Sequence, residues 1–155
     1  MSARGLCDGF PVAGQMAVLE HMRSGAVTTP GLAIAAAGNA AAKASAFSYR
    51  IDGKIHDKTA QATIALTNLG SLGTKSSGAA FLSINANGDV AVEAVTTDEA
   101  GAIRVPEPEA GYCLFGAVQV ATSNATFTGG TTALDASGIT TTYHNLSGMI
   151  PGEPL

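Results

Sequence analysis

The clearest alternation of apolar and polar residues along the chain lies between residues 44 and 51. Phe47, Tyr49 and Ile51 fall on one side of an extended segment, and Ser48 and Arg50 fall on the other. Successive side chains of a strand point to opposite faces of its sheet, so this pattern is typical of a strand with one buried face. We expect Tyr49 to lie in the core.

The segment that follows predicts a β-hairpin. Asp52-Gly53 separates the strand from a second extended run, Lys54-Ile55-His56-Asp57. An Asp-Gly pair between two strands favours a type I′ turn, because both central residues of that turn need positive φ. The two runs are therefore predicted to pair with each other.

A second hairpin and a long strand are predicted further along the chain. Phe81-Leu82-Ser83-Ile84 leads into the turn sequence Asn85-Ala86-Asn87-Gly88, and the return strand carries valines at 90, 92 and 95. Residues 112–122 form the longest apolar stretch, which is typical of a strand in the middle of a sheet. We expect Phe81 and Phe115 to be core residues.

The other segments between residues 31 and 147 give shorter elements. Residues 32–46 are rich in alanine, yet Gly38-Asn39 interrupts them, which favours a strand, a turn and a strand over a helix. Short strands are expected at 126–128, with Phe127 in the core, and at 131–134 and 139–143. Residues 96–111 combine acidic residues and prolines with few apolar ones, so they are predicted to form a surface loop.

The N-terminal segment follows a different period. Val12, Met16, Leu19 and Met22 share one face at helical spacing, Pro11 suits the first helical position, and Gly25 suits the C-terminal stop. The sequence thus predicts a mainly β protein: an antiparallel β-sandwich or barrel-like body with a short N-terminal amphipathic helix or arm. We place the arm at residues 1–30, the body at 31–147 and an extended tail at 148–155.

Composition restricts the kinds of partner. Only 13% of the 155 residues are charged and 46% are hydrophobic, against about 25% charged in ordinary domains, which favours a surface partly covered by other subunits. The net charge of −4 has no basic stripe, so no nucleic-acid partner is expected. The run Gly31 to Ala37 is much shorter than the roughly 18 residues of a membrane span, and no signal peptide is evident, so we expect synthesis and retention in a cytoplasm.

Candidate catalytic groups are few. His56 stands beside Asp57, but neighbours on a strand face opposite sides, so a shared site is geometrically awkward. His21 and His144 have no second histidine at metal-binding spacing. Cys7 and Cys113 form no CxxC pair. We therefore expect no enzyme activity and no cofactor, with Cys113 a buried thiol in an apolar strand.

Two further motifs have ordinary explanations. Asn85, Asn87, Gly88 and Asp89 faintly resemble a calcium loop, but the order of ligands required in an EF-hand fails, and a hairpin turn accounts for the same residues. Gly129-Gly130-Thr131-Thr132 lacks the lysine and the helix of a phosphate-binding loop, so it is interpreted as a turn. No metal site is expected.

The order of segments resembles that of small virion structural proteins of tailed bacteriophages, of the head-decoration or capsid-cement type. The matching segments are Ala46 to Lys54, Phe81 to Val90, Leu114 to Val120 and Thr126 to Thr132. The resemblance implies a homotrimer that binds the major capsid protein on the outer surface of the head, stabilises the shell and is located in the virion.

The resemblance does not extend to the N-terminal helix, whose apolar face is our prediction for the docking arm. This arm spans Gly9 to Arg23, and its expected capsid-docking residues are Phe10, Val12, Met16, Leu19 and Met22. Two alternatives stay open. One is a tail, baseplate or fibre component. The other is a host-surface or carbohydrate-binding module, against which the absence of tryptophan and the presence of only three tyrosines argue.

Overall fold

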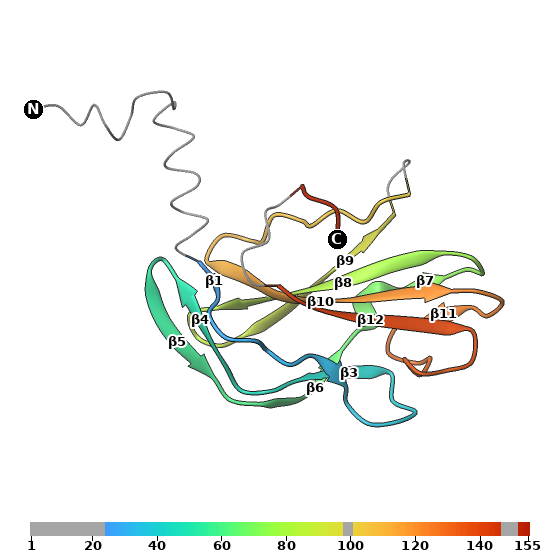
Figure 1. The fold of residues 1–155 in the computed structure, drawn as a ribbon, viewed down its shortest axis with the longest axis horizontal. Coiled ribbons are helices and arrows are strands. Elements are labelled where there is room, and N and C mark those ends of the chain that lie inside the picture. Colours follow the sequence, from blue (N-terminus) through green and yellow to red (C-terminus); the bar gives the residue numbers. More distant parts are fainter. Residues whose placement is uncertain (1–23, 98–100, 147–151) are drawn as a thin grey trace, which may run out of the picture.

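The computed structural model describes residues 24–97, 101–146 and 152–155, and within them the chain is mainly β (Figure 1). The prediction of a mainly β protein is confirmed. The predicted N-terminal helix lies outside the described residues. The strands are β1 (Gly25–Ala26), β2 (Ala33–Ile34), β3 (Ala41–Ala44), β4 (Phe47–Ile51), β5 (Lys54–Lys58), β6 (Gln61–Ala65), β7 (Ser71–Leu72), β8 (Ser77–Asn85), β9 (Val90–Thr96), β10 (Tyr112–Thr122), β11 (Phe127–Thr128) and β12 (Ile139–Asn145), with one 3-10 turn, η1 (Thr67–Leu69).

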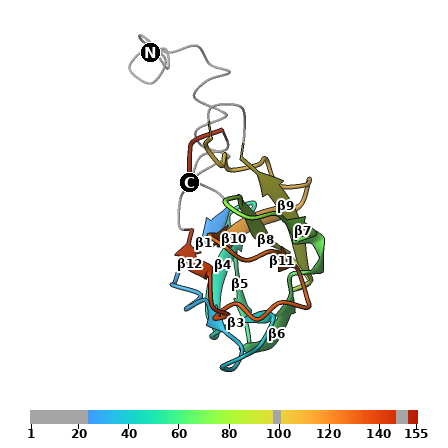
Figure 2. The same cartoon turned by 90° about the vertical axis from the view of Figure 1, so that its right-hand side faces the viewer.

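The strands form several antiparallel sheets arranged in layers. The largest sheet has the order β12-β10-β8-β9, and two three-stranded sheets, β1-β4-β5 and β2-β3-β6, lie beside it, with a small β11-β7 pair (Figures 1 and 2). Among the described strands no sheet closes into a barrel. Within the described residues, no helix has the length and apolar character that crossing a membrane requires.

The β4–β5 hairpin has the turn that the sequence predicts. Asp52 and Gly53 have φ values of 49° and 79°, and Ile51 pairs with Lys54 directly across the two-residue turn. Phe47, Tyr49 and Ile51 are buried, as the alternation indicates. Both the hairpin and its buried face are confirmed.

Strand β10 is the structural centre of the large sheet, and its bounds match the predicted strand. It pairs with β8 on one side and with β12 on the other. The register between β10 and β8 shifts between Leu114 and Gly116. A Cβ at Gly116 would collide with the Leu32 side chain, so the glycine permits this close approach. The predicted β8–β9 hairpin and the strand at 139–143 are confirmed as well.

The main core lies between the inner face of the large sheet and the smaller sheets. The rings of Phe47 and Phe115 stack within it with centroids 4.9 Å apart, and Tyr49 and Phe127 are buried there too. The main core comprises Leu32, Ala42, Ala44, Phe47, Tyr49, Ile51, Ile64, Leu66, Leu69, Leu72, Ala80, Leu82, Ile84, Cys113, Phe115, Val118, Val120, Phe127 and Leu134.

A second core covers part of the outer face of the large sheet. It consists of Ala79, Phe81, Ile103, Val105, Ala117 and Leu146, with Leu155 packed against it. Ile103 and Val105 come from the segment predicted to be a surface loop, and they are only 5% and 2% exposed. This corrects the prediction. The segment is irregular, but backbone bonds to residues 152–155 hold its two apolar side chains against the sheet.

Those bonds make a short clasp between two distant parts of the chain. The N–H of Leu155 donates to the carbonyl of Ile103 at 2.8 Å, and the N–H of Val105 donates to the carbonyl of Glu153 at 2.9 Å. Arg104 and Pro154 form an isolated bridge between them. Residues 152–155 are thus paired with another segment of the chain, while the extended form predicted for residues 148–155 stays a prediction.

Two further local predictions can be compared with the structure. The alanine-rich segment forms β2 and β3 around a turn at Gly38-Asn39, as expected. Residues 131–134 are not a strand, because the N–H groups of Thr131 and Thr132 both donate back to the carbonyl of Thr128 and curl the chain.

The described part of the predicted arm is joined to the body. β1 pairs with β4, so that Gly25 lies opposite Arg50 and Ala26 opposite Tyr49, and Pro30 is fully buried. Residues 25–30 therefore pack as part of the body, while the division of the chain at residue 30 stays a prediction.

Candidate functional site

The predicted docking residues lie outside the described part of the chain, but the structure shows where their segment joins the body. These residues are Phe10, Val12, Met16, Leu19 and Met22. At the junction, the Ser24 hydroxyl accepts a hydrogen bond of 3.1 Å from the N–H of Asp52, in the β4–β5 turn. Ser24, the first described residue, thus lies beside the β4–β5 turn.

The outer side of the β1-β4-β5 sheet is the candidate binding surface, and we call it the hairpin face. Register places Val27 beside Ser48, since the N–H of Val27 donates to the Ser48 carbonyl, and it places Ile55 opposite Arg50. The hairpin face consists of Val27, Ser48, Arg50, Ile55 and Asp57. Ile55 is 67% exposed and Val27 is 47% exposed, which makes them the large apolar side chains most open to solvent in the described chain.

Polar groups surround these two side chains. Arg50 and Asp57 are exposed and of opposite charge. The Ser48 hydroxyl donates to the Asp57 carboxylate at 2.5 Å, which fixes that carboxylate on the face. Val27 and Ile55 lie on opposite sides of β4, with Ser48 and Arg50 between them, so the face mixes apolar and polar side chains, as surfaces that bind another protein commonly do.

The opposite side of the hairpin is held rigidly against the large sheet. The Tyr49 hydroxyl donates to the carbonyl of Asn85 at 2.9 Å, and the Lys58 ammonium donates to the carbonyl of Gly88 at 2.7 Å. The Tyr49 ring stacks on His56 with centroids 5.4 Å apart. Burial, with smaller effects from Cys113 and Asp89, raises the pKa of Tyr49, so the hydroxyl stays protonated as a donor.

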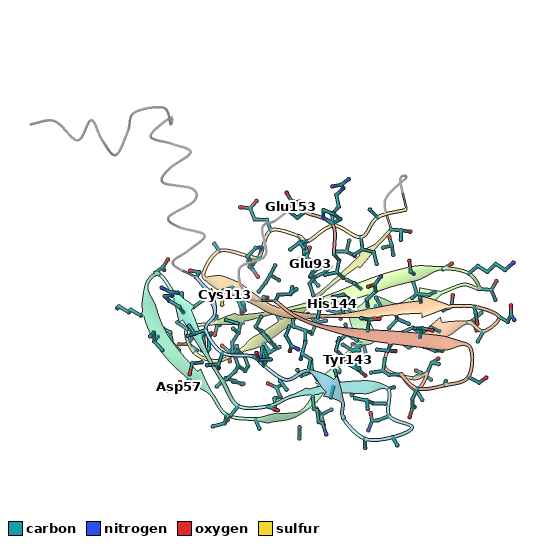
Figure 3. All side chains as sticks on the ribbon, viewed as in Figure 1. Asp57, Glu93, Cys113, Tyr143, His144 and Glu153 are labelled. Atoms are coloured by element: carbon teal, nitrogen blue, oxygen red, sulfur yellow. The ribbon has the colours of Figure 1, made fainter. Side chains whose placement is uncertain are left out.

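His56 and Asp57 do not form a shared site. His56 pairs with Tyr49 on the inner side, whereas Asp57 pairs with Ser48 on the hairpin face. Their opposite orientation agrees with the prediction. Figure 3 shows Asp57 on β5 at the margin of the molecule.

His144 lies on the outer face of the large sheet. Its Nε2 is 3.0 Å from the side-chain oxygen of Gln119, and burial lowers the pKa of the imidazole. Figure 3 shows His144 and Tyr143 on opposite sides of β12, with Tyr143 toward the main core. Burial also raises the pKa of Tyr143, with a smaller effect from Asp135. His144 is therefore a neutral imidazole at neutral pH, and its partner is the side-chain amide of Gln119.

Cys113 is the free thiol of the main core. It is 3% exposed, and burial raises its pKa to about 11. A thiol is a weak nucleophile in its protonated form, so this environment makes Cys113 unreactive at neutral pH. The prediction of a buried thiol is confirmed.

The turn with the faint likeness to a calcium loop is closed by its own hydrogen bonds. The Asn85 side-chain oxygen accepts from the N–H groups of Asn87 and Asp89, each at 2.9 Å, and its amide nitrogen donates to the Asp89 carboxylate. Within residues 24–97, 101–146 and 152–155, no three His, Cys, Asp or Glu side chains gather as a metal site would require.

The exposure of Ile55 was missed by reasoning from the sequence, although the sequence contains a signal for it. Across a two-residue turn between residues 51 and 54, position 55 must lie opposite Arg50 and share its polar face. The other residues of the hairpin on that face are polar, so an isoleucine there breaks the alternation of apolar and polar residues.

The fold and surface define a mainly β protein with two exposed apolar side chains, Val27 and Ile55, on the outer side of the β1-β4-β5 sheet. No protein-family model matches this chain, and no curated protein or solved structure is significantly similar to it.

Proposed function

We propose that this protein is a non-enzymatic structural subunit of a tailed-phage particle that decorates the outer surface of the head. The observation that carries the binding role is the exposure of Ile55 and Val27 on the sheet that the N-terminal segment enters. The resemblance supplies the nature of the partner, the major capsid protein, and places the chain in the virion as a trimer with a β-sandwich body.

The segments that carry the resemblance occupy neighbouring parts of the fold. They correspond to β4 with its turn, the β8–β9 hairpin, β10, and β11 with the following turn. β10 pairs with β8, and Phe115 of β10 stacks on Phe47 of β4. Segments distant in sequence thus share one core.

In this proposal, docking uses the N-terminal segment together with the hairpin face. Ser24 joins the segment to the β4–β5 turn, so apolar residues of the arm and Ile55 can contact one neighbouring surface. Burying a fully exposed isoleucine side chain contributes about 1.5–3 kcal/mol to the free energy of binding. Ile55 is 67% exposed before binding, so its contribution is smaller. Many copies on one shell would add such contacts and stabilise it.

Mass spectrometry of purified particles tests the location of the protein. A copy number comparable to that of the major capsid protein supports decoration. A few copies per particle would instead support a tail, baseplate or fibre component. Absence from particles contradicts both.

Variants test the docking surface. Removing residues 1–23 should leave a folded body that no longer binds capsids, and Ile55→Asp should lower occupancy on capsids lacking the protein. Ala62→Asp, at an exposed position of β6, is the matched control and should bind normally. Full occupancy by the Ile55→Asp protein would exclude the hairpin face, and full occupancy by the truncated protein would exclude the arm.

A further inference from the structure

Strand β12 is an open edge of the large sheet. It is seven residues long, and it pairs with β10 on one side without any shift of register from Ile139 to Asn145. Figure 2 shows β12 at one margin of the body, with β9 toward the other. Its sequence, ITTTYHN, has no acidic residue, lysine, arginine or proline.

The edge strands β5 and β9 carry features that discourage pairing, and the uncharged edge strand β6 is only five residues long and has an irregular register with β3. β5 contains Lys54, Asp57 and Lys58. In β9, the Asn68 side chain donates to the carbonyl of Val92 at 2.7 Å and so occupies part of the edge. Proteins commonly protect sheet edges with charges and with groups that cover the backbone. β12 has neither in the described part of the chain.

The hydrogen-bond pattern identifies which backbone groups of β12 face outward. Ser123 donates to Gly138 and Leu146 donates to Phe115, both in register with the β10–β12 ladder. Bonded pairs alternate along an antiparallel ladder, so the even-numbered residues of β12 bond to β10. The N–H and C=O groups of Thr141 and Tyr143 therefore point away from the sheet, and no described backbone group bonds to them.

We propose that β12 pairs in antiparallel fashion with β12 of a second copy of this chain, about a two-fold axis at Thr142. In this register Thr141 of each copy lies opposite Tyr143 of the other, and their outward groups form the ladder. Thr142 faces its own counterpart in a pair without mutual hydrogen bonds. The two large sheets become one continuous sheet across the dimer.

A second copy fits this edge because β12 is complementary to itself. Pairing about Thr142 brings Thr140 opposite His144 and leaves no like charges opposed. Cross-strand threonine pairs are favourable, whereas like charges directly opposite are destabilising. The same operation on β5 would place Lys54 opposite Lys58. A two-fold contact uses the same patch on both subunits, which self-complementarity requires.

A charge substitution tests the axis. Native mass spectrometry of the full chain should show a dimer of twice 15.4 kDa, and Thr142→Lys should abolish it because two lysines would meet. Thr63→Lys, at an exposed threonine of edge strand β6, is the matched control and should remain dimeric. Mixing Thr142→Lys with Thr142→Glu should restore a mixed dimer. Circular dichroism checks that each variant is folded.

A disulfide tests the register. In an antiparallel pair without mutual hydrogen bonds, Cα atoms lie about 4.5 Å apart, within the range that a disulfide spans. In a Cys7→Ser background, oxidised Thr142→Cys protein should become a covalent dimer, whereas Thr140→Cys protein should not, since its counterpart lies several residues away along the strand.

These outcomes concern the isolated protein, so they do not test whether it decorates a capsid, but a dimer would contradict the trimer that the resemblance implies. A wild-type monomer, a trimer, or a dimer that survives Thr142→Lys overturns β12 pairing. The trimer would agree with the oligomer that the resemblance implies, so one mass measurement distinguishes the two assemblies.

Discussion

The two cores of this protein lie on opposite faces of one sheet and are assembled in different ways. Strands on both sides enclose the main core, where Phe115 stacks on Phe47. The second core has strands on one side only, and an irregular segment carrying Ile103 and Val105 closes it with help from residues 152–155. An apolar face of a sheet can thus be covered without a facing sheet, provided the covering backbone finds partners.

Phe115→Ala should have the largest effect on stability. Phe115 is fully buried, and its removal leaves a cavity between two sheets that cannot readily collapse, so we expect a loss of about 3–5 kcal/mol in the free energy of unfolding. Urea denaturation followed by circular dichroism measures it. Ile55→Ala, at an exposed position, should change stability by only about 0.5 kcal/mol. Similar losses for both variants would contradict the assignment of the main core.

Ile103→Ala should have a smaller effect, of about 2 kcal/mol, at the lower end of the range for such truncations. The irregular segment can move toward the sheet and fill part of the space. The double variant with Phe115→Ala tests whether the cores are independent, since distant sites add to within about 0.5 kcal/mol. Strong non-additivity in urea denaturation would mean that the two cores act as one.

Thiol labelling of Cys113 should separate the cores by accessibility. In a Cys7→Ser background, Phe115→Ala should raise the labelling rate by about 100-fold to 4,000-fold, which is its expected loss of stability converted at 1.4 kcal/mol per factor of ten. Removing residues 152–155 opens only the second core and should raise the rate about tenfold at most. Equal rates for the two variants would show that the clasp also holds the main core.

Mild acid should cause the smallest loss of stability, and the loss should come from His144 on the outer face of the large sheet. Burial lowers the folded-state pKa of His144, so the unfolded state takes up a proton first as the pH falls below the unfolded pKa of about 6.5. The contribution of His144 to stability is therefore present above that pH and is lost as the pH falls through the folded pKa. Unfolding of wild type and His144→Gln at several pH values measures it, and the variant should lose less stability. Equal pH dependence of both proteins would exclude His144 as the source.

The predictions from the sequence succeeded where the chain repeats with period two. The alternation of Phe47, Tyr49 and Ile51 with polar residues predicted a strand with one buried face, and the pair Asp52-Gly53 predicted the turn. Both signals come from residues close together in the sequence. Ile103 and Val105 give no such signal, since a pair of apolar residues around an arginine is equally compatible with a solvated loop. Their burial depends on residues some fifty positions away, whose pairing no local pattern encodes.

The candidate surface was predictable only in part. The position of Ile55 follows from the hairpin register. Its exposure has a second cause, which is that no other described segment covers that face of the sheet. The predicted docking residues of the N-terminal arm stay a prediction. The open edge of β12 required the complete order of strands in the sheet, which joins β8, β9, β10 and β12 across a long stretch of sequence.

The clasp between residues 103–105 and 152–155 also allows the two cores to open separately. Every strand that encloses the main core lies before residue 146, whereas the second core also needs residues 152–155. Release of the clasp alone uncovers Phe81 and Ala117 and leaves the main core closed, so the amide of Val105 should exchange with solvent sooner than the amides of β10.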